Sequence, residues 1–122
     1  MKYAFLLIAL AGCQPKVPVL PGLISEVAAF DGWYTTDGKT RIPFAGGRED
    51  GQLICKILLA GIACDNVKGP GRGALTLTFA GPKTQVVELA STQPIAVMDG
   101  QSFTIRMDDL MAILDRLAKS GR

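Results

Sequence analysis

The sequence predicts an α+β fold, a small antiparallel β-sheet of about six strands with a C-terminal helix on one face. Three observations carry this prediction. Residues 74–80 alternate between apolar and polar side chains, which is typical of a half-buried strand. Asp-Gly pairs at 37–38 and 99–100 favour tight hairpin turns. Residues 110–118 carry an apolar stripe at helical spacing. A small open β-barrel is the alternative.

The first thirteen residues have the layout of a secretory signal. Lys2 gives a positive start, an apolar run follows, and the run ends in Leu10-Ala11-Gly12-Cys13. The apolar run is about half as long as the roughly 20 residues that span a membrane. The ending resembles the lipobox of bacterial lipoproteins, over this signal and Gln14 only. The resemblance implies cleavage before Cys13 and lipid attachment to that cysteine. Secretion without lipidation and an uncleaved segment are the alternatives.

The resemblance also implies a location and a domain organisation. Gln14, rather than Asp, follows the cysteine, as in enteric lipoproteins of the outer membrane. We therefore expect a lipid-anchored envelope protein, facing the periplasm from the outer membrane where the host has two membranes. Residues 1–12 would be the signal peptide. Residues 13–22 contain three prolines and predict an extended lipidated tether, or a strand on the domain edge. Residues 23–122 would form one domain.

The next segments predict a short helix and a hairpin. Residues 23–30 place apolar side chains on one helical face, although so short a segment is also compatible with a strand. In 33–44, β-forming residues flank an Asp-Gly pair and predict a hairpin. Pro43 limits its second strand to a sheet edge, because proline cannot donate a ladder hydrogen bond. The glycine-rich segment 45–51 predicts a loop.

The apolar segment 52–66 contains Cys55 and Cys64 and has two interpretations. In a single helix the nine-residue spacing gives about 13.5 Å of rise, too far for a disulfide. In two strands folded near 59–61, the cysteines would face each other. An exported protein meets oxidising conditions, which favour disulfides. We therefore expect a strand hairpin with a Cys55–Cys64 disulfide; a buried helix and two free thiols are the alternative.

The second half of the chain predicts a loop, a meander of strands and the final helix. Residues 67–73 contain three glycines and a proline and predict a loop. Strands are expected at 74–80 and 84–90, followed by a hairpin around Asp99-Gly100. Asp108 can cap the helix that follows, and Asp109 suits its positive end.

Composition excludes several functions. The chain has no histidine, so the usual near-neutral general base and histidine-containing zinc sites are absent. With Cys13 lipidated, two cysteines remain, too few for an all-cysteine zinc site. We therefore expect no enzyme, no catalytic residue, no metal and no cofactor. The net charge of +2, without a basic cluster, argues against a nucleic-acid partner.

Three residues are candidates for binding. Trp33 and Tyr34 alternate on a predicted strand, so one should face the core and the other solvent, with core packing the simpler role for Trp33. Arg72 lies in Gly69-Pro70-Gly71-Arg72-Gly73, which could bind an anion but is more simply a surface turn. The adjacent carboxylates of Asp108 and Asp109 are better explained as the start of a helix than as catalytic groups.

These observations favour a binding protein attached to the membrane through its N-terminal lipid. We expect its partner to be an envelope protein, as for assembly factors, secretion accessories and surface-exclusion lipoproteins, which illustrate the class. Two alternatives are a hydrolase inhibitor and a lipid carrier. Projecting loops at 45–51 and 67–73 would favour inhibition. A flat apolar patch or an unpaired sheet edge would favour assembly. A lipid carrier would need a cavity lined by Leu53, Ile57, Leu75 and Leu77.

Overall fold

The computed structural model describes residues 17–65, 71–81 and 83–120. The predicted signal peptide, the predicted lipidation site at Cys13, and the part of the 67–73 segment before Gly71 lie outside these residues. The described chain forms one open antiparallel sheet of seven strands in the order β2-β1-β4-β5-β6-β7-β3. The elements are η1 (Ile24–Glu26), β1 (Val27–Tyr34), β2 (Ile42–Gly46), α2 (Arg48–Leu59), β3 (Ile62–Cys64), β4 (Gly71–Phe79), β5 (Lys83–Ala90), β6 (Ile95–Met98), β7 (Gln101–Thr104) and α3 (Met107–Ser120).

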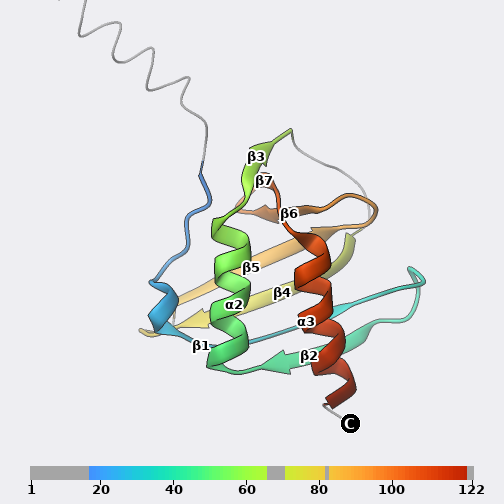
Figure 1. Ribbon diagram of the computed structural model, residues 1–122, viewed down its shortest axis with the longest axis horizontal. Helices are drawn as coiled ribbons and strands as arrows, with labels where there is room; N and C mark the ends of the chain where they lie inside the picture. The colour runs from blue at the N-terminus through green and yellow to red at the C-terminus, as the bar shows by residue number, and fades with distance from the viewer. Residues whose placement is uncertain (1–16, 66–70, 82, 121–122) are drawn as a thin grey trace, which may run out of the picture.

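The predicted α+β class is confirmed, with one more strand than expected and a second helix. The barrel alternative is wrong, because β2 and β3 lie at opposite edges of an open sheet. Helices α2 and α3 run side by side over the same face of the sheet (Figure 1). The other face carries no described helix (Figure 1).

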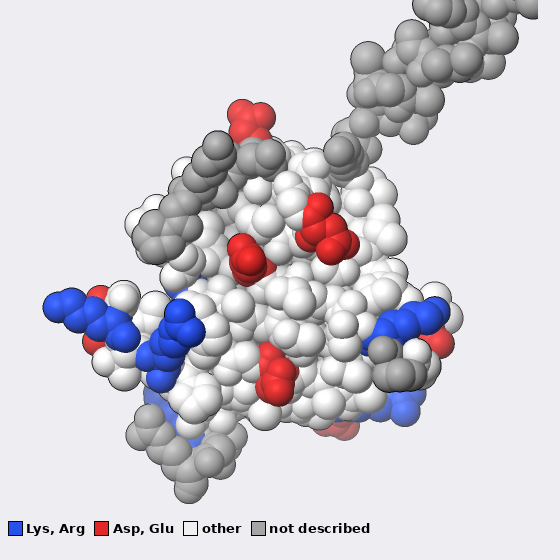
Figure 2. All heavy atoms as spheres, turned by 180° about the vertical axis from the view of Figure 1, so that it is seen from behind, with Lys and Arg blue, Asp and Glu red and all other residues white. Residues whose placement is uncertain are grey.

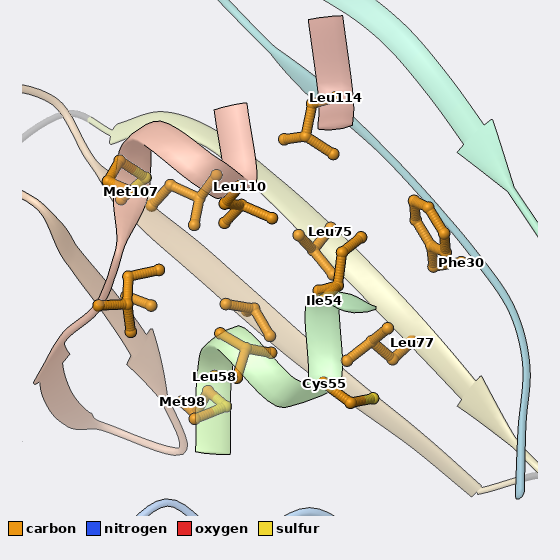
Figure 3. Packing of buried hydrophobic residues seen from close by; sticks show 14 of the residues in the cluster. Phe30, Ile54, Cys55, Leu58, Leu75, Leu77, Met98, Met107, Leu110 and Leu114 are labelled. Atoms are coloured by element: carbon orange, nitrogen blue, oxygen red, sulfur yellow. The ribbon is translucent and has the colours of Figure 1, made fainter. Parts of the chain in front are cut away.

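The core lies between the two helices and the sheet. Alternate residues of β4 are buried, beginning with Leu75 and Leu77, because a strand sends every second side chain to one face. Ile54 of α2 and Leu110 of α3 meet them from above (Figure 3). The predicted strand at 74–80 and the predicted C-terminal helix are therefore confirmed. Asp108 lies within the first turn of α3 rather than before it.

The predicted strand hairpin at 52–66 is wrong. Helix α2 occupies most of this segment and buries Gly51, Ile54, Cys55 and Leu58, a spacing that fits one face of a helix. A nearly uniform apolar run fits strand and helical periods equally, so the pattern could not discriminate between them. The predicted loop at 45–51 is also wrong, because it contains the end of β2 and the start of α2.

The N-terminal segments also differ from expectation. Residues 23–30 form the short 3-10 turn η1 and then the start of β1, so the strand alternative is correct there. From Val17 the chain runs alongside α2 (Figure 1), and half-buried Leu20 packs against the core. The last part of the predicted tether is therefore attached to the domain.

The two Asp-Gly pairs have different outcomes. Asp99 and Gly100 have φ angles of 51° and 79° and join β6 directly to β7, so this tight hairpin is confirmed. β1 and β2 also form a hairpin, but a longer loop, residues 35–41, connects them. The Asp37-Gly38 pair lies inside that loop instead of forming a two-residue turn.

Candidate functional site

The register of the sheet defines its helix-free surface. Residues that face each other across two antiparallel strands share a face, so Trp33 lies on the same face as Ala74, and Asp31 on the same face as Thr76. Their neighbours Leu75 and Leu77 point toward the helices, so this shared face points away from the helices. We call this surface the open face. Its described members on the four best-paired strands are Ala29, Asp31, Trp33, Pro43, Ala45, Ala74, Thr76, Thr78, Thr84, Val86 and Glu88.

The open face is flat because most of its side chains are small. Alanine and threonine fill the centre, and Val86 is the large aliphatic residue there with 53% of its surface exposed. Figure 2 shows this face as mostly uncharged, with scattered acidic groups over the sheet and basic groups at the sides. Asp31 and Glu88 are exposed acidic members of the face. A surface of this kind offers area without a deep groove.

Trp33 is the aromatic member of the open face. It is half-buried, between Pro43 on β2 and Ala74 on β4. The guanidinium carbon of Arg41 lies 4.0 Å from the centre of its ring, within the range of a cation–π contact. The prediction that Trp33 packs in the core is therefore wrong. The Trp33–Arg41 pair therefore places an aromatic ring and a guanidinium in contact on the open face.

Tyr34 points the other way, into the core, where 2% of its surface is exposed. Its ring packs beside Phe44, with centroids 6.2 Å apart. Its hydroxyl donates to Asp115 Oδ1 at 3.1 Å. The alternation predicted for Trp33 and Tyr34 is thus observed, but Tyr34 as a binding residue is a wrong prediction, since a partner could not reach its ring.

Arg72 lies at a register shift of β4, and its Nε donates to the carbonyl oxygen of Ala90 at 2.6 Å. The half-buried side chain therefore stabilises the neighbouring strand. It also lines a hollow of about 470 Å³, together with Thr35, Ser91, Asp108 and Met111. The structure thus brings Arg72 and Asp108 to one hollow. Residues 71–73 belong to β4, so the loop and surface turn predicted there are wrong for this part, and Gly69 and Pro70 lie outside the described residues.

The 35–41 loop is ordered by Asp37. The Oδ1 atom of Asp37 accepts hydrogen bonds from the backbone N–H groups of Lys39 at 2.7 Å and Thr40 at 2.8 Å. The Thr35 hydroxyl adds a third at 3.1 Å. These donors, the Thr40 N–H foremost, lower the pKa of Asp37 to about 2. This network fixes the loop that carries Arg41 toward Trp33.

The predicted Cys55–Cys64 disulfide is not formed, and both cysteines are free. Cys55 lies on α2 with its side chain in the core (Figure 3), where burial raises the pKa of its thiol to about 11. Ala63 opposite buried Phe103 faces the helices, so its neighbour Cys64 lies toward the open face. The sheet therefore separates the two thiols.

The features expected of the alternative functions are not found in the described chain. Leu75 and Leu77 are packed in the core while Leu53 is 47% exposed, so these residues do not line one lipid cavity. The 45–51 segment is strand and helix, not a projecting inhibitory loop. Within residues 17–65, 71–81 and 83–120, no cluster of three or more potential metal ligands occurs.

No helix among the described residues has the length and hydrophobicity needed to cross a bilayer. Sequence reasoning missed Arg41, Asp31, Val86 and Glu88 as members of the candidate surface. The outward alternation of Thr76 and Thr78 pointed to such a surface, but the partners on β1 and β5 depend on register. Comparisons with protein-family models, curated proteins and solved structures found no match.

Proposed function

We propose that this chain is an envelope lipoprotein whose domain binds another protein through the open face. The observation that carries the proposal is the one-sided covering of the sheet. Helices α2 and α3 cover one face, and Trp33 lies half-buried on the other, stacked with Arg41. Tryptophan and arginine are the residue types that most often dominate binding energy at protein interfaces.

The shape and charge of the open face favour a folded protein as the partner. Small side chains such as Ala74 and Thr76 give a flat surface, which suits another flat surface better than a peptide or small molecule. Its acidic members, Asp31 and Glu88, oppose nucleic acid and would complement basic groups on the partner. Trp33 would supply the apolar anchor and Arg41 a polar rim.

Membrane attachment rests on the sequence alone. The ending Leu10-Ala11-Gly12-Cys13 supports lipidation of Cys13, and Gln14 supports the outer membrane as the site in a host with two membranes. Intact mass of the mature protein tests the anchor, which should add diacylglycerol and remove residues 1–12. Cys13→Ser should leave the unprocessed precursor. A mature mass that retains Met1 to Gly12 would refute the anchor without affecting the binding surface.

Site-specific photocrosslinking in intact cells tests the binding surface. A photoreactive residue is introduced at Thr76 or Val86 on the open face. The matched control carries it at Asp109, on the solvent-exposed side of α3. We expect one discrete adduct from both open-face positions and not from position 109. Mass spectrometry of the adduct then identifies the partner, whose affinity can be measured with purified proteins.

The affinity measurement tests the contribution of Trp33 to binding. Trp33→Ala should weaken binding by about 30-fold, which corresponds to the roughly 2 kcal/mol of an interface hot spot. Thr84→Ala, on the same face, should have little effect, and circular dichroism should show both variants folded. Adducts that form only from position 109 would contradict the proposed surface. So would a partner whose affinity is lost in Asp108→Asn or Asp109→Asn but kept in Trp33→Ala, and catalysis would then have to be reconsidered.

A further inference from the structure

Exposed aliphatic side chains gather around the N-terminal segment and α2. Val17, Val19 and Leu23 have 69%, 70% and 68% of their surface exposed, and Leu59 at the end of α2 has 39%. We call these four residues the apolar flank. Isolated exposed aliphatic residues are ordinary on protein surfaces, whereas a contiguous group marks an interaction site.

Three members of the flank, Val19, Leu23 and Leu59, form one surface because the N-terminal segment lies against α2. A hollow of about 600 Å³ is lined by Val19, Leu23 and Leu59, together with Leu20 and Ile24, and most of its lining is apolar. The segment descends along the side of the domain next to α2 (Figure 1). The flank therefore combines two parts of the chain into one surface.

Hydrogen bonds fix the part of this surface around Leu23. The backbone N–H of Leu23 donates to Glu26 Oε1 at 2.8 Å, and the N–H of Glu26 donates to the Leu23 carbonyl at 2.9 Å. Arg48 of α2 donates from Nη2 to the carbonyl oxygen of Ser25 at 2.8 Å. Half-buried Ile24 packs against the core. The exposed side chains are thus presented by a docked segment and not by a free tether.

We propose that the apolar flank inserts into the interface of the bilayer that holds the lipid on Cys13. This inference rests on the lipid anchor of the proposed function. Val17 follows Cys13 by four residues, and four residues reach at most about 14 Å even when extended. The anchor therefore keeps the flank next to the headgroup region. Side chains that are about two-thirds exposed project outward, which suits insertion into the acyl boundary better than enclosure of a ligand.

Insertion of the flank would also orient the domain. The N-terminal segment lies along one side of the molecule in Figure 1, whereas the open face is the rear surface seen in Figure 2. The membrane would therefore contact the side of the domain that includes Val19 and Leu59. The open face with Trp33 would stand away from the bilayer and remain accessible to a partner protein.

Tryptophan fluorescence in vesicles tests the contact. Trp33 is the only tryptophan, so Trp33→Phe gives a silent background for Leu23→Trp, with Val86→Trp on the open face as the matched control. The mature protein is extracted from its membrane and reconstituted into phosphatidylethanolamine–phosphatidylglycerol vesicles with or without brominated acyl chains. Flotation of the vesicles reports membrane association, and the intact mass of the same preparation reports the lipid on Cys13 separately. We expect flotation, and quenching of the position 23 emission by about half, with little change at position 86.

Each other outcome has a defined meaning. Flotation without quenching at position 23 overturns the inserted flank and leaves the anchor intact. Equal quenching at positions 23 and 86 overturns the proposed orientation. Loss of both flotation and quenching refutes the anchor and the flank together, whereas flotation and quenching of a protein whose intact mass lacks the lipid support membrane contact by the flank alone. A dimer in detergent that Leu23→Glu dissociates, with position 23 unquenched in vesicles, assigns the flank to a second copy and overturns the proposal.

Discussion

The hydroxyl of Tyr34 donates a hydrogen bond to Asp115 Oδ1 at 3.1 Å, linking the end of β1 to the middle of α3. The same carboxylate forms an ion pair with Lys119 through Oδ2 at 3.1 Å. Lys119 first, and Tyr34 second, lower the pKa of Asp115. The helix is thus connected to the same strand that presents Trp33 on the opposite face, so the position of α3 and the conformation of the binding hairpin are related.

Tyr34→Phe should remove this link while keeping the ring beside Phe44. We expect a loss of about 1 kcal/mol in the free energy of unfolding, because the substitution removes the hydroxyl and with it the hydrogen bond to Asp115. The pKa of Asp115 should rise toward its ordinary value, which carboxyl NMR titration can measure. Lys119→Met, which removes the stronger cause, should raise that pKa further. An unchanged pKa of Asp115 in both variants would contradict the assigned contacts.

The loop that carries Arg41 should depend on pH through Asp37. Its pKa is lowered from 3.8 to about 2, so the folded loop favours the ionised carboxylate. The stabilisation is therefore fully present above pH 3.8 and is lost as pH falls through about 2. The amide resonances of Lys39 and Thr40 should shift together with that midpoint.

Two substitutions separate the charge of Asp37 from its acceptor oxygen. Asp37→Asn keeps an oxygen that can accept from the backbone, so the loop should remain ordered and lose its acid transition. Asp37→Ala removes the acceptor, and hydrogen exchange at Lys39 and Thr40 should become faster even at neutral pH. Exchange that stays unchanged in Asp37→Ala would show that the loop is ordered by other contacts.

The sequence predicted the parts of the fold where one period dominates. The alternation around Leu75 and Leu77 fits a strand and not a helix. The stripe containing Leu110 and Leu114 fits a helix and not a strand. The run that became α2 is apolar at almost every position, so its period was hidden and an assumed disulfide decided in favour of strands. Burial of Cys55 beneath α2 and the position of Cys64 on β3 show that this assumption was wrong.

The candidate surface was predictable only in part. Adjacent strand residues must point in opposite directions, so one of Trp33 and Tyr34 had to face outward. Which one did depends on the register between β1 and β4, where Gly32 lies opposite buried Leu75. The approach of Arg41 to Trp33 depends on a loop conformation fixed by backbone donors to one carboxylate. Side-chain identity alone does not encode either relationship.

The two free cysteines should react at very different rates. Cys55 is fully buried and burial raises its thiol pKa to about 11, so little of the nucleophilic thiolate exists under native conditions. Cys64 is half-buried on the short edge strand β3. Iodoacetamide at mildly alkaline pH should alkylate Cys64 first, and Cys55 only when the protein unfolds. Peptide mapping measures both rates, and a linked Cys55–Cys64 peptide under non-reducing conditions would contradict the free-thiol structure.

Two adjacent leucines of α2 provide a matched test of its buried face and of the apolar flank. Leu58 is fully buried, so Leu58→Ala should leave a cavity and lower the free energy of unfolding by about 2–5 kcal/mol. Leu59 is 39% exposed on the flank, so Leu59→Ala should cost less than about 1 kcal/mol. Urea denaturation of both variants measures the difference. The contrast tests which side chain is buried and does not separate helix from strand, because neighbouring residues of a strand also point in opposite directions. Equal losses at the two positions would contradict the assigned buried face of α2.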